Sequence, residues 1–208
     1  ETVLNERLIM KKKSEILPNN ICFITHQLEH LHNVSVSISF KAGSLYESKY
    51  NNGISHLVEH LFFRQLSDLF QESLYFNMQK IGGEITGKTY CDYVTFSINV
   101  IPQYLYDALD IMLKFFDDFE WSNSIILKEK EVVLRQIENK AYSYNQWIVS
   151  IYFDNTKYTL PIMGTKKTVK SLTAFEINSW KKEYFSPANS CVTLTGNFSN
   201  CLLYTSDA

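Results

Sequence analysis

The chain has 208 residues, 45 % of them hydrophobic and only 4 Pro and 7 Gly, enough for one large domain or two small ones and too few breakers for long disordered linkers. Its formal net charge of −2 gives no support for binding to nucleic acid or to an anionic membrane surface, and no hydrophobic run approaches the ~18 residues of a membrane span. The four cysteines lie far apart with no C-x-x-C pattern, and no signal peptide is recognisable, so we expect free thiols in a cytoplasmic protein rather than disulfides or a Cys-type zinc site.

The first predicted elements are two strands. Ile21–Gln27 is a short hydrophobic run, and Asn33–Phe40 alternates Val, Ile and Phe with Ser, which is typical of a half-buried strand. The connection between them carries His30 and His32, with His26 just before it. Three histidines so close together are compatible with a metal site, although histidines on a hairpin connection more often lie in solvent.

The middle of the chain is predicted to form two helices and a hairpin. In order, these are a helix from Gly53 or Ile54 to about Gln65, a second helical segment over Asp68–Lys80, and strands over Glu84–Tyr90 and Tyr93–Val100. Gly82 and Gly83 are typical of a helix C-terminus, and Cys91 and Asp92 are predicted to form the turn between the strands.

The C-terminal half is predicted to be mostly helical. Pro102 stands where the first turn of a helix tolerates proline, and a hydrophobic stripe at helical spacing follows it as far as Phe119. The remaining predicted elements are a helix over Ser124–Tyr144, a helical candidate over Trp147–Tyr158, a helix over Leu172–Phe185 closed by Pro187, and a strand over Cys191–Thr195. Because strand pairs alternate with helix pairs, we predict an α+β fold, a mostly antiparallel sheet with helices packed on one side.

The first middle helix carries the pattern H-x-x-E-H, made by His56, Glu59 and His60. Residues four apart on a helix share a face, so both imidazoles can meet at one ion, and Glu59 lies beside them. A carboxylate there can move the proton of an activated water, and this order is the inverzincin motif. The alternative is a helix with two surface histidines and a glutamate. Ser55 is either the N-cap or part of the first turn.

Further motifs extend beyond this pattern and occur in one order along the chain. With H-x-x-E-H, they resemble the N-terminal half-domain of the pitrilysin/insulinase family of zinc endopeptidases, which includes the mitochondrial processing peptidases. The stretches similar to family motifs are Gly43-Ser-Leu-Tyr-Glu47, Gly53 to His60, Ile81 to Thr89, Glu129 to Gln136, Pro161 to Thr165 and Tyr184 to Asn189. The resemblance covers about residues 15–198.

The resemblance implies a set of site residues. His56 and His60 are expected to be zinc ligands, with Glu59 as the catalytic general base. The family's third ligand is a glutamate on the helix of the E-x-x-x-V-x-x-E motif, and in this chain that position holds Gln136. Glu129, seven residues earlier on the same helix, matches a family glutamate that supports the site from outside the ligand set.

Gln136 is the main departure from the family pattern. Its amide oxygen can still coordinate a cation but carries no net charge, so we expect weaker zinc binding and slow or absent turnover. Glu129 lies two turns away, about 10 Å along the helix axis. Glu131 and Glu138 point to other sides of the helix, so none of the three is expected to replace it.

The resemblance also implies a substrate-binding strand and a partner. Thr86, Gly87, Lys88 and Thr89 match the strand that pairs with an extended peptide substrate, although the same residues also suit an ordinary edge strand. Family members combine two similar half-domains around a chamber. We therefore expect residues 1–198 to form one metallopeptidase half-domain that needs a second half, while residues 199–208 resemble no expected continuation.

Two functions follow from these observations. One is a zinc metalloendopeptidase half that hydrolyses peptides or small unstructured proteins, supported by the intact H-x-x-E-H and weakened by Gln136. The other is a catalytically inactive substrate-binding or scaffolding subunit that partners an active half.

Overall fold

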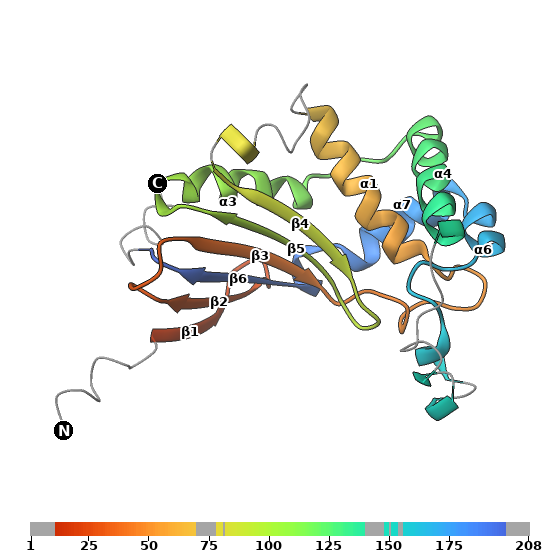
Figure 1. Cartoon of the computed structure of the whole chain (residues 1–208), viewed down its shortest axis with the longest axis horizontal. Coiled ribbons are helices and arrows are strands. Elements are labelled where there is room, and N and C mark those ends of the chain that lie inside the picture. The colour runs from red at the N-terminus through yellow and green to blue at the C-terminus, as the bar shows by residue number, and fades with distance from the viewer. Residues whose placement is uncertain are drawn as a thin grey trace.

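The computed structural model describes residues 11–69, 78–80, 82–139, 148–149, 151–153 and 156–198. A six-stranded sheet forms its centre, with strand order β1-β2-β6-β3-β5-β4 (Figure 1). The strands are β1 Lys11–Ile16, β2 Cys22–Gln27, β3 Val34–Phe40, β4 Glu84–Thr89, β5 Val94–Val100 and β6 Ser190–Gly196. Every neighbouring pair is antiparallel except β2 and β6, which run parallel. The predicted α+β class and mostly antiparallel sheet are confirmed.

The predicted helices occur in the predicted order, with differences at their ends, and one further helix, α6, is not predicted from the sequence. They are α1 Ile54–Leu69, α3 Leu105–Leu113, α4 Asn123–Asn139, α6 Lys166–Ser171 and α7 Ala174–Tyr184, with short 3₁₀ turns at Pro102–Tyr104, Lys114–Phe116, Lys157–Thr159 and Pro187–Asn189. In Figure 1, α3 lies along the sheet near one end of the strands, whereas α1, α4, α6 and α7 lie together at the opposite end.

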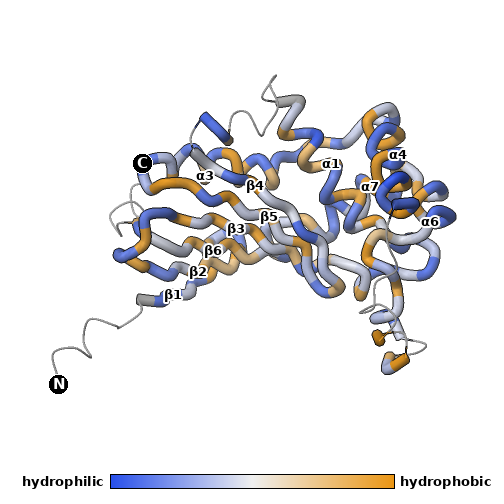
Figure 2. The backbone as a smooth tube through the Cα atoms, in the orientation of Figure 1, coloured by the Kyte–Doolittle hydropathy of each residue, from blue (hydrophilic) through white to orange (hydrophobic). Residues whose placement is uncertain are grey.

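The helices cover one face of the sheet. On β3 the side chains of Val34, Val36, Ile38 and Phe40 are buried at 0–1 % exposure, whereas the serines between them are half-buried. Strand β5 repeats this pattern in register, and the uncovered face carries a polar row in which the hydroxyls of Ser37 and Ser97 hydrogen-bond at 2.8 Å. The hydrophobic colour recurs along the central strands and α1 in Figure 2. Packing on one side is therefore confirmed.

The buried aromatic core holds α1 against the sheet. The Phe62 ring lies 5.5 Å from Phe96 on β5, 5.1 Å from Phe115 and 5.2 Å from Trp121, measured between centroids. Burial of one such ring contributes about 1.5–3 kcal/mol, and edge-to-face pairs add about 0.5–1.5 kcal/mol. Phe62 comes two residues after His60 on the same helix, so this packing fixes the position of the H-x-x-E-H turn.

Some predicted elements differ from the observed ones. Strand β1 is missing from the prediction because its sequence, KKKSEI, has no hydrophobic run, as an edge strand in solvent allows. Helix α1 continues four residues past Gln65. The predicted helix over 172–185 begins later, at Ala174, because Thr173 and Glu176 form a capping box, and α6 before it has its own box at Thr165 and Thr168.

Four predicted segments lie partly or wholly outside the described residues. Of the helical segment over Asp68–Lys80, residues 70–77 lie outside, while 78–80 are helical. The candidate over Trp147–Tyr158 is described only in pieces, and the C-terminal end of the helix over 124–144 lies outside beyond Asn139. The tail over 199–208 lies outside entirely, so the expectation for these residues stays a prediction.

The histidine and cysteine expectations can be compared with the structure. His30 and His32 are exposed, whereas His26 is half-buried on β2. The connection that carries His30 and His32 is not a hairpin as predicted, because β6 lies between β2 and β3 in the sheet. Cys22, Cys91 and Cys191 are free thiols, as predicted. Within the described residues, no helix is long and hydrophobic enough to cross a membrane.

Candidate metal centre

A buried carboxylate fixes the start of α1. Glu47 is fully buried and its oxygens accept hydrogen bonds from the backbone N–H groups of Gly53 (2.8 Å) and Ser55 (2.9 Å) and from the Asn52 amide (2.8 Å). Burial raises the pKa of Glu47, and these hydrogen bonds act in the opposite direction. Glu47 thus satisfies donors of the first helical turn, which have no partner within the helix itself.

Backbone contact with a distant loop also positions this helix start. Gly53 has φ +94° and Gly164 has φ +74°, and a methyl group added to Gly53 would lie 2.8 Å from the Cα of Gly164. The Asn52 amide donates to the carbonyl of Pro161 at 3.0 Å. Only glycine combines such φ values with so close a backbone approach. The stretches Gly53 to His60 and Pro161 to Thr165, both similar to family motifs, therefore contact each other.

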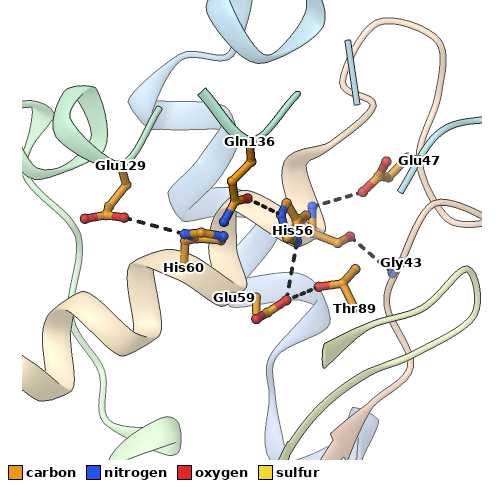
Figure 3. A network of polar contacts seen from close by, with 9 residues as sticks. Gly43, Glu47, His56, Glu59, His60, Thr89, Glu129 and Gln136 are labelled. Carbon is orange, nitrogen blue, oxygen red and sulfur yellow. Dashed lines mark hydrogen bonds and ion pairs between the residues drawn. The ribbon is translucent and has the colours of Figure 1, made fainter. Parts of the chain in front are cut away.

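The H-x-x-E-H residues lie together as predicted on one side of α1 (Figure 3). The rings of His56 and His60 are 4.8 Å apart between centroids, at an interplanar angle of 76°. His56 Nδ1 is 3.4 Å from Glu59 Oε2, a contact without hydrogen-bond alignment. Ser55 belongs to the first turn, and its buried hydroxyl accepts from the backbone N–H of Gly43 at 3.1 Å rather than capping the helix.

Helix α4 supplies the opposite wall of the centre. Gln136 Oε1 lies 3.1 Å from His56 Nε2, and Glu129 Oε2 lies 3.7 Å from His60 Nδ1. Figure 3 shows the other ring nitrogen of His60 on the side of His56 and Gln136. The predicted register of α4 therefore brings residue 136 to the two histidines and Glu129 behind one of them.

Glu59 is held as a buried carboxylate. Its side chain accepts a short hydrogen bond of 2.5 Å from the Thr89 hydroxyl on β4 and is 8 % exposed. Burial by itself raises the pKa of Glu59, but the interactions with His56, Thr89 and His60 outweigh it, so the pKa lies below its ordinary value. A carboxylate that stays ionised near neutral pH can accept a proton.

The side chains that could coordinate a cation at this centre are only partly suited to one. The Nδ1 atoms of His56 and His60 lie 3.4 and 3.7 Å from carboxylate oxygens, which leaves Nε2 of each ring for coordination. The third donor is an amide oxygen, so the set contains two imidazoles and no anion. This composition explains why no group of three His, Cys, Asp or Glu side chains forms here among the described residues.

A cleft of about 590 Å³ opens beside the centre. Its walls include Glu59, His60, Phe63 and Gln136 on the helices and residues 84–88 of β4. Strand β4 is last in the strand order, and among the described residues its outer edge pairs with no strand. Gly87 faces α1, where an added methyl group would lie 2.3 Å from Phe63 Cε2 and 2.8 Å from Glu59 Oε1, so the absence of a side chain lets β4 pack directly against α1 at the carboxylate.

Two features of the site are not predicted from the sequence. Glu47 has no predicted role, although it belongs to the G-S-x-x-E pattern, because its function depends on backbone donors that fold around it. Thr89 is predicted only to contact substrate, whereas its hydroxyl donates to Glu59. Strand alternation places Thr89 on the same face of β4 as the buried Ile85, but the contact with Glu59 also depends on how β4 packs against α1.

The sequence of this chain is similar to known proteins. Residues 23–166 match the family model described as Insulinase (Peptidase family M16). The chain is 24 % identical over 191 residues to the "Uncharacterized zinc protease YmxG" of Bacillus subtilis, covering 89 % of this chain and 46 % of that protein. It thus spans about half the length of this relative.

Two solved structures have the same fold. A protease from Helicobacter pylori superposes with a TM-score of 0.82 at 20 % identity, covering 94 % of this chain and 49 % of that one. A peptidase M16 inactive domain from Pseudomonas fluorescens superposes with a TM-score of 0.78 at 12 % identity, over 94 % and 49 % of the two chains. Both are about twice as long as the matched region.

Proposed function

Because the chain belongs to the insulinase family, peptidase family M16, we propose that it is the metal-binding half of a zinc-dependent endopeptidase that hydrolyses peptides or small unstructured proteins. The observation that carries the proposal is the convergence of His56, His60 and Gln136 beside the buried carboxylate of Glu59. These three side chains would hold the ion, through two imidazole nitrogens and one amide oxygen. A zinc ion held there would supply Lewis-acid activation of water and of the peptide carbonyl.

Glu59 is proposed as the general base and later the general acid. Its lowered pKa keeps it ionised and able to accept a proton from the attacking water, and the Thr89 hydroxyl holds one of its oxygens in place. The same group can then deliver that proton to the leaving amine. Glu129 would orient the ring of His60 through Nδ1 and so act as a positioning residue.

The substrate is proposed to bind along β4. An extended peptide can add to the free edge of this strand through main-chain hydrogen bonds, which give affinity with little sequence preference. The predicted substrate-binding residues Thr86, Gly87, Lys88 and Thr89 make up this strand end, and the first three line the cleft. A peptide on this edge would pass beside Glu59, which lies close to β4 because Gly87 has no side chain.

Gln136 makes the proposed site weaker than one with a glutamate. A carboxylate would add a negative charge to a dication, whereas the amide contributes only its dipole. We therefore expect weak zinc binding and slow hydrolysis in the native chain.

The rest of the active enzyme is proposed to come from a second homologous half-domain. The chain covers about half of its relatives and of the solved structures that share its fold. The second half would lie in the same full-length chain or in another subunit. A cytoplasmic location stays a prediction.

A second candidate function is a catalytically inactive substrate-binding or scaffolding subunit. The neutral side chain of Gln136 favours it, as does the fold shared with a domain described as inactive. In this case β4 would still bind an extended peptide, but the centre would not hold the ion tightly enough for turnover.

Metal binding and cleavage by the native protein and a Gln136→Glu variant separate the two functions. Both are expressed with any natural remainder of the reading frame, and zinc affinity and chelator-sensitive cleavage of an unstructured peptide are measured. The variant should bind zinc at least about tenfold more tightly, since a charge next to a dication contributes more than about 1.4 kcal/mol even at water-like screening. The matched control is Gln103→Glu, at an exposed position outside the site.

Each result supports one candidate. Stoichiometric zinc and cleavage in the native protein support the enzyme. Zinc and cleavage only in the Gln136→Glu variant support the binding subunit. Unchanged zinc affinity in that variant would contradict the proposed position of residue 136 as a ligand.

A further inference from the structure

A pair of cysteines lies outside the metal centre, on neighbouring strands of the sheet. Cys22 at the start of β2 and Cys191 on β6 are register partners in the one parallel strand pair. Register partners in adjacent strands project to the same face of a sheet. Here it is the face away from the helices, because Ser39, the β3 partner of Cys191, belongs to the polar row and not to the core.

The spacing of the two residues suits a covalent link. Paired strands lie ~4.8 Å apart, and disulfides span Cα separations of about 4.4–6.8 Å. Both side chains are half-buried thiols in the structure, so neither is sealed in the core. Cys191 also lines a cleft of about 470 Å³ together with Ser39, Lys41 and Asp92, which gives a small reagent a route to its sulfur.

From this placement we propose that Cys22 and Cys191 are an oxidative modification site, at which a low-molecular-weight disulfide such as oxidised glutathione converts the two thiols into a disulfide joining β2 to β6. The link would connect a strand near the beginning of the described chain to the strand at its end. It does not depend on the proposed peptidase function, because neither cysteine belongs to the metal centre.

The exchange proceeds in two balanced steps. One cysteine thiolate attacks a sulfur of oxidised glutathione, forming a mixed disulfide and releasing one glutathione thiolate. The second cysteine thiolate then attacks the protein sulfur of that mixed disulfide, forming the Cys22–Cys191 bond and releasing the second glutathione. The two protein thiols are oxidised, the glutathione disulfide is reduced, and both protons end on the released glutathione thiols.

The surroundings weaken Cys191 as a nucleophile, while the adjacent position of the two cysteines favours the second step. Burial, together with interaction with the Cys22 thiol, raises the pKa of Cys191 to about 11, so little nucleophilic thiolate is present at neutral pH. Once one cysteine carries glutathione, its register partner is adjacent at a high effective concentration. A stable mixed disulfide is therefore not expected to accumulate at this pair.

The test is oxidation of the folded full chain by excess oxidised glutathione at pH 8.5, followed by alkylation and peptide mass spectrometry without reduction. The expected product is a cross-linked pair of peptides containing Cys22 and Cys191, with loss of two hydrogens and no retained glutathione at either. Cys91, which is also half-buried, reports on reagent access in the same sample through its mixed disulfide.

A Cys22→Ser variant is the matched control. It should retain glutathione on Cys191 or leave that thiol free, and it should give no cross-link. Persistent glutathione on both Cys22 and Cys191 of the native chain would overturn the proposal. The same holds if both thiols stay free while Cys91 is modified, or if Cys22 and Cys191 cross-link to other cysteines instead.

Discussion

Helices α1 and α4 face each other across the candidate centre, and they differ in what they supply. Helix α1 provides two imidazoles and a carboxylate, and Glu47 and Gly53 fix its first turn from outside. Helix α4 brings Gln136, an uncharged amide, to within 3.1 Å of His56 Nε2. The comparison separates position from charge, because Gln136 lies next to the histidines but brings no charge to them.

The largest expected effect comes from removing the carboxylate that α1 supplies. In the Gln136→Glu background, Glu59→Gln should lower peptide cleavage by about 10²–10⁴-fold, the usual contribution of a positioned acid–base group, while zinc content stays unchanged. Cleavage rate and metal content are measured on the same samples. Glu131→Gln, at an exposed position of α4, is the matched control. Equal cleavage by the Glu59 and Glu131 variants would show that α1 does not supply the base.

The next largest effect tests how α1 is held. Glu47→Ala should lower the free energy of unfolding by about 3 kcal/mol, because it leaves the backbone donors of Gly53 and Ser55 unsatisfied in a buried place. Denaturant unfolding measures the loss, with the exposed Glu29→Ala as control. A loss no larger than that of the control would mean that the aromatic core alone positions the helix.

The last effect is spread over a range of pH and concerns Lys181 on α7, outside the two site helices. Its ammonium group donates to the carbonyls of Asp117 (3.1 Å) and Phe119 (2.7 Å), and burial lowers its pKa from 10.5 to about 8. Since the unfolded chain holds this proton up to a higher pH, the destabilising contribution is complete below pH 8 and is lost between about pH 8 and 10.5.

The native protein should therefore gain stability relative to Lys181→Met over that pH range, by at most about 1.4 kcal/mol per pH unit. Unfolding free energies of both proteins across the range give the difference, and the exposed Lys182→Met serves as control. A pH-independent difference would show that Lys181 keeps its ordinary pKa. Zinc binding by the Lys181→Met variant, measured in parallel at neutral pH, should equal that of the native protein, because Lys181 lies outside α1 and α4.

Local patterns in the sequence predict much of this fold and less of the site. The alternation in β3 and β5 and the helical spacing of His56 and His60 each follow from a single element, so they are readable from consecutive residues. The polar β1 has no such pattern, because pairing with β2 alone holds it at the edge. The break between α6 and α7 depends on capping at Thr173, within a stretch whose hydrophobic spacing is continuous.

The site contacts that escape prediction join elements far apart in the chain. The third-ligand position of Gln136 comes from resemblance to the family, because no local rule places α4 against α1. The contact from Thr89 to Glu59 and the proximity of Cys22 to Cys191 likewise depend on strand register, which long-range pairing sets. Such contacts are accessible only after the sheet order is known.

The backbone contact between Gly53 and Gly164 has a consequence for protein engineering. The segment that begins α1 and the loop before α6 fit each other through bare backbone, so neither can accept a larger residue alone. A transplant of the H-x-x-E-H helix into another scaffold would therefore have to carry residues 161–165 as well. The smallest unit that could be transplanted thus consists of two segments that are far apart in the sequence.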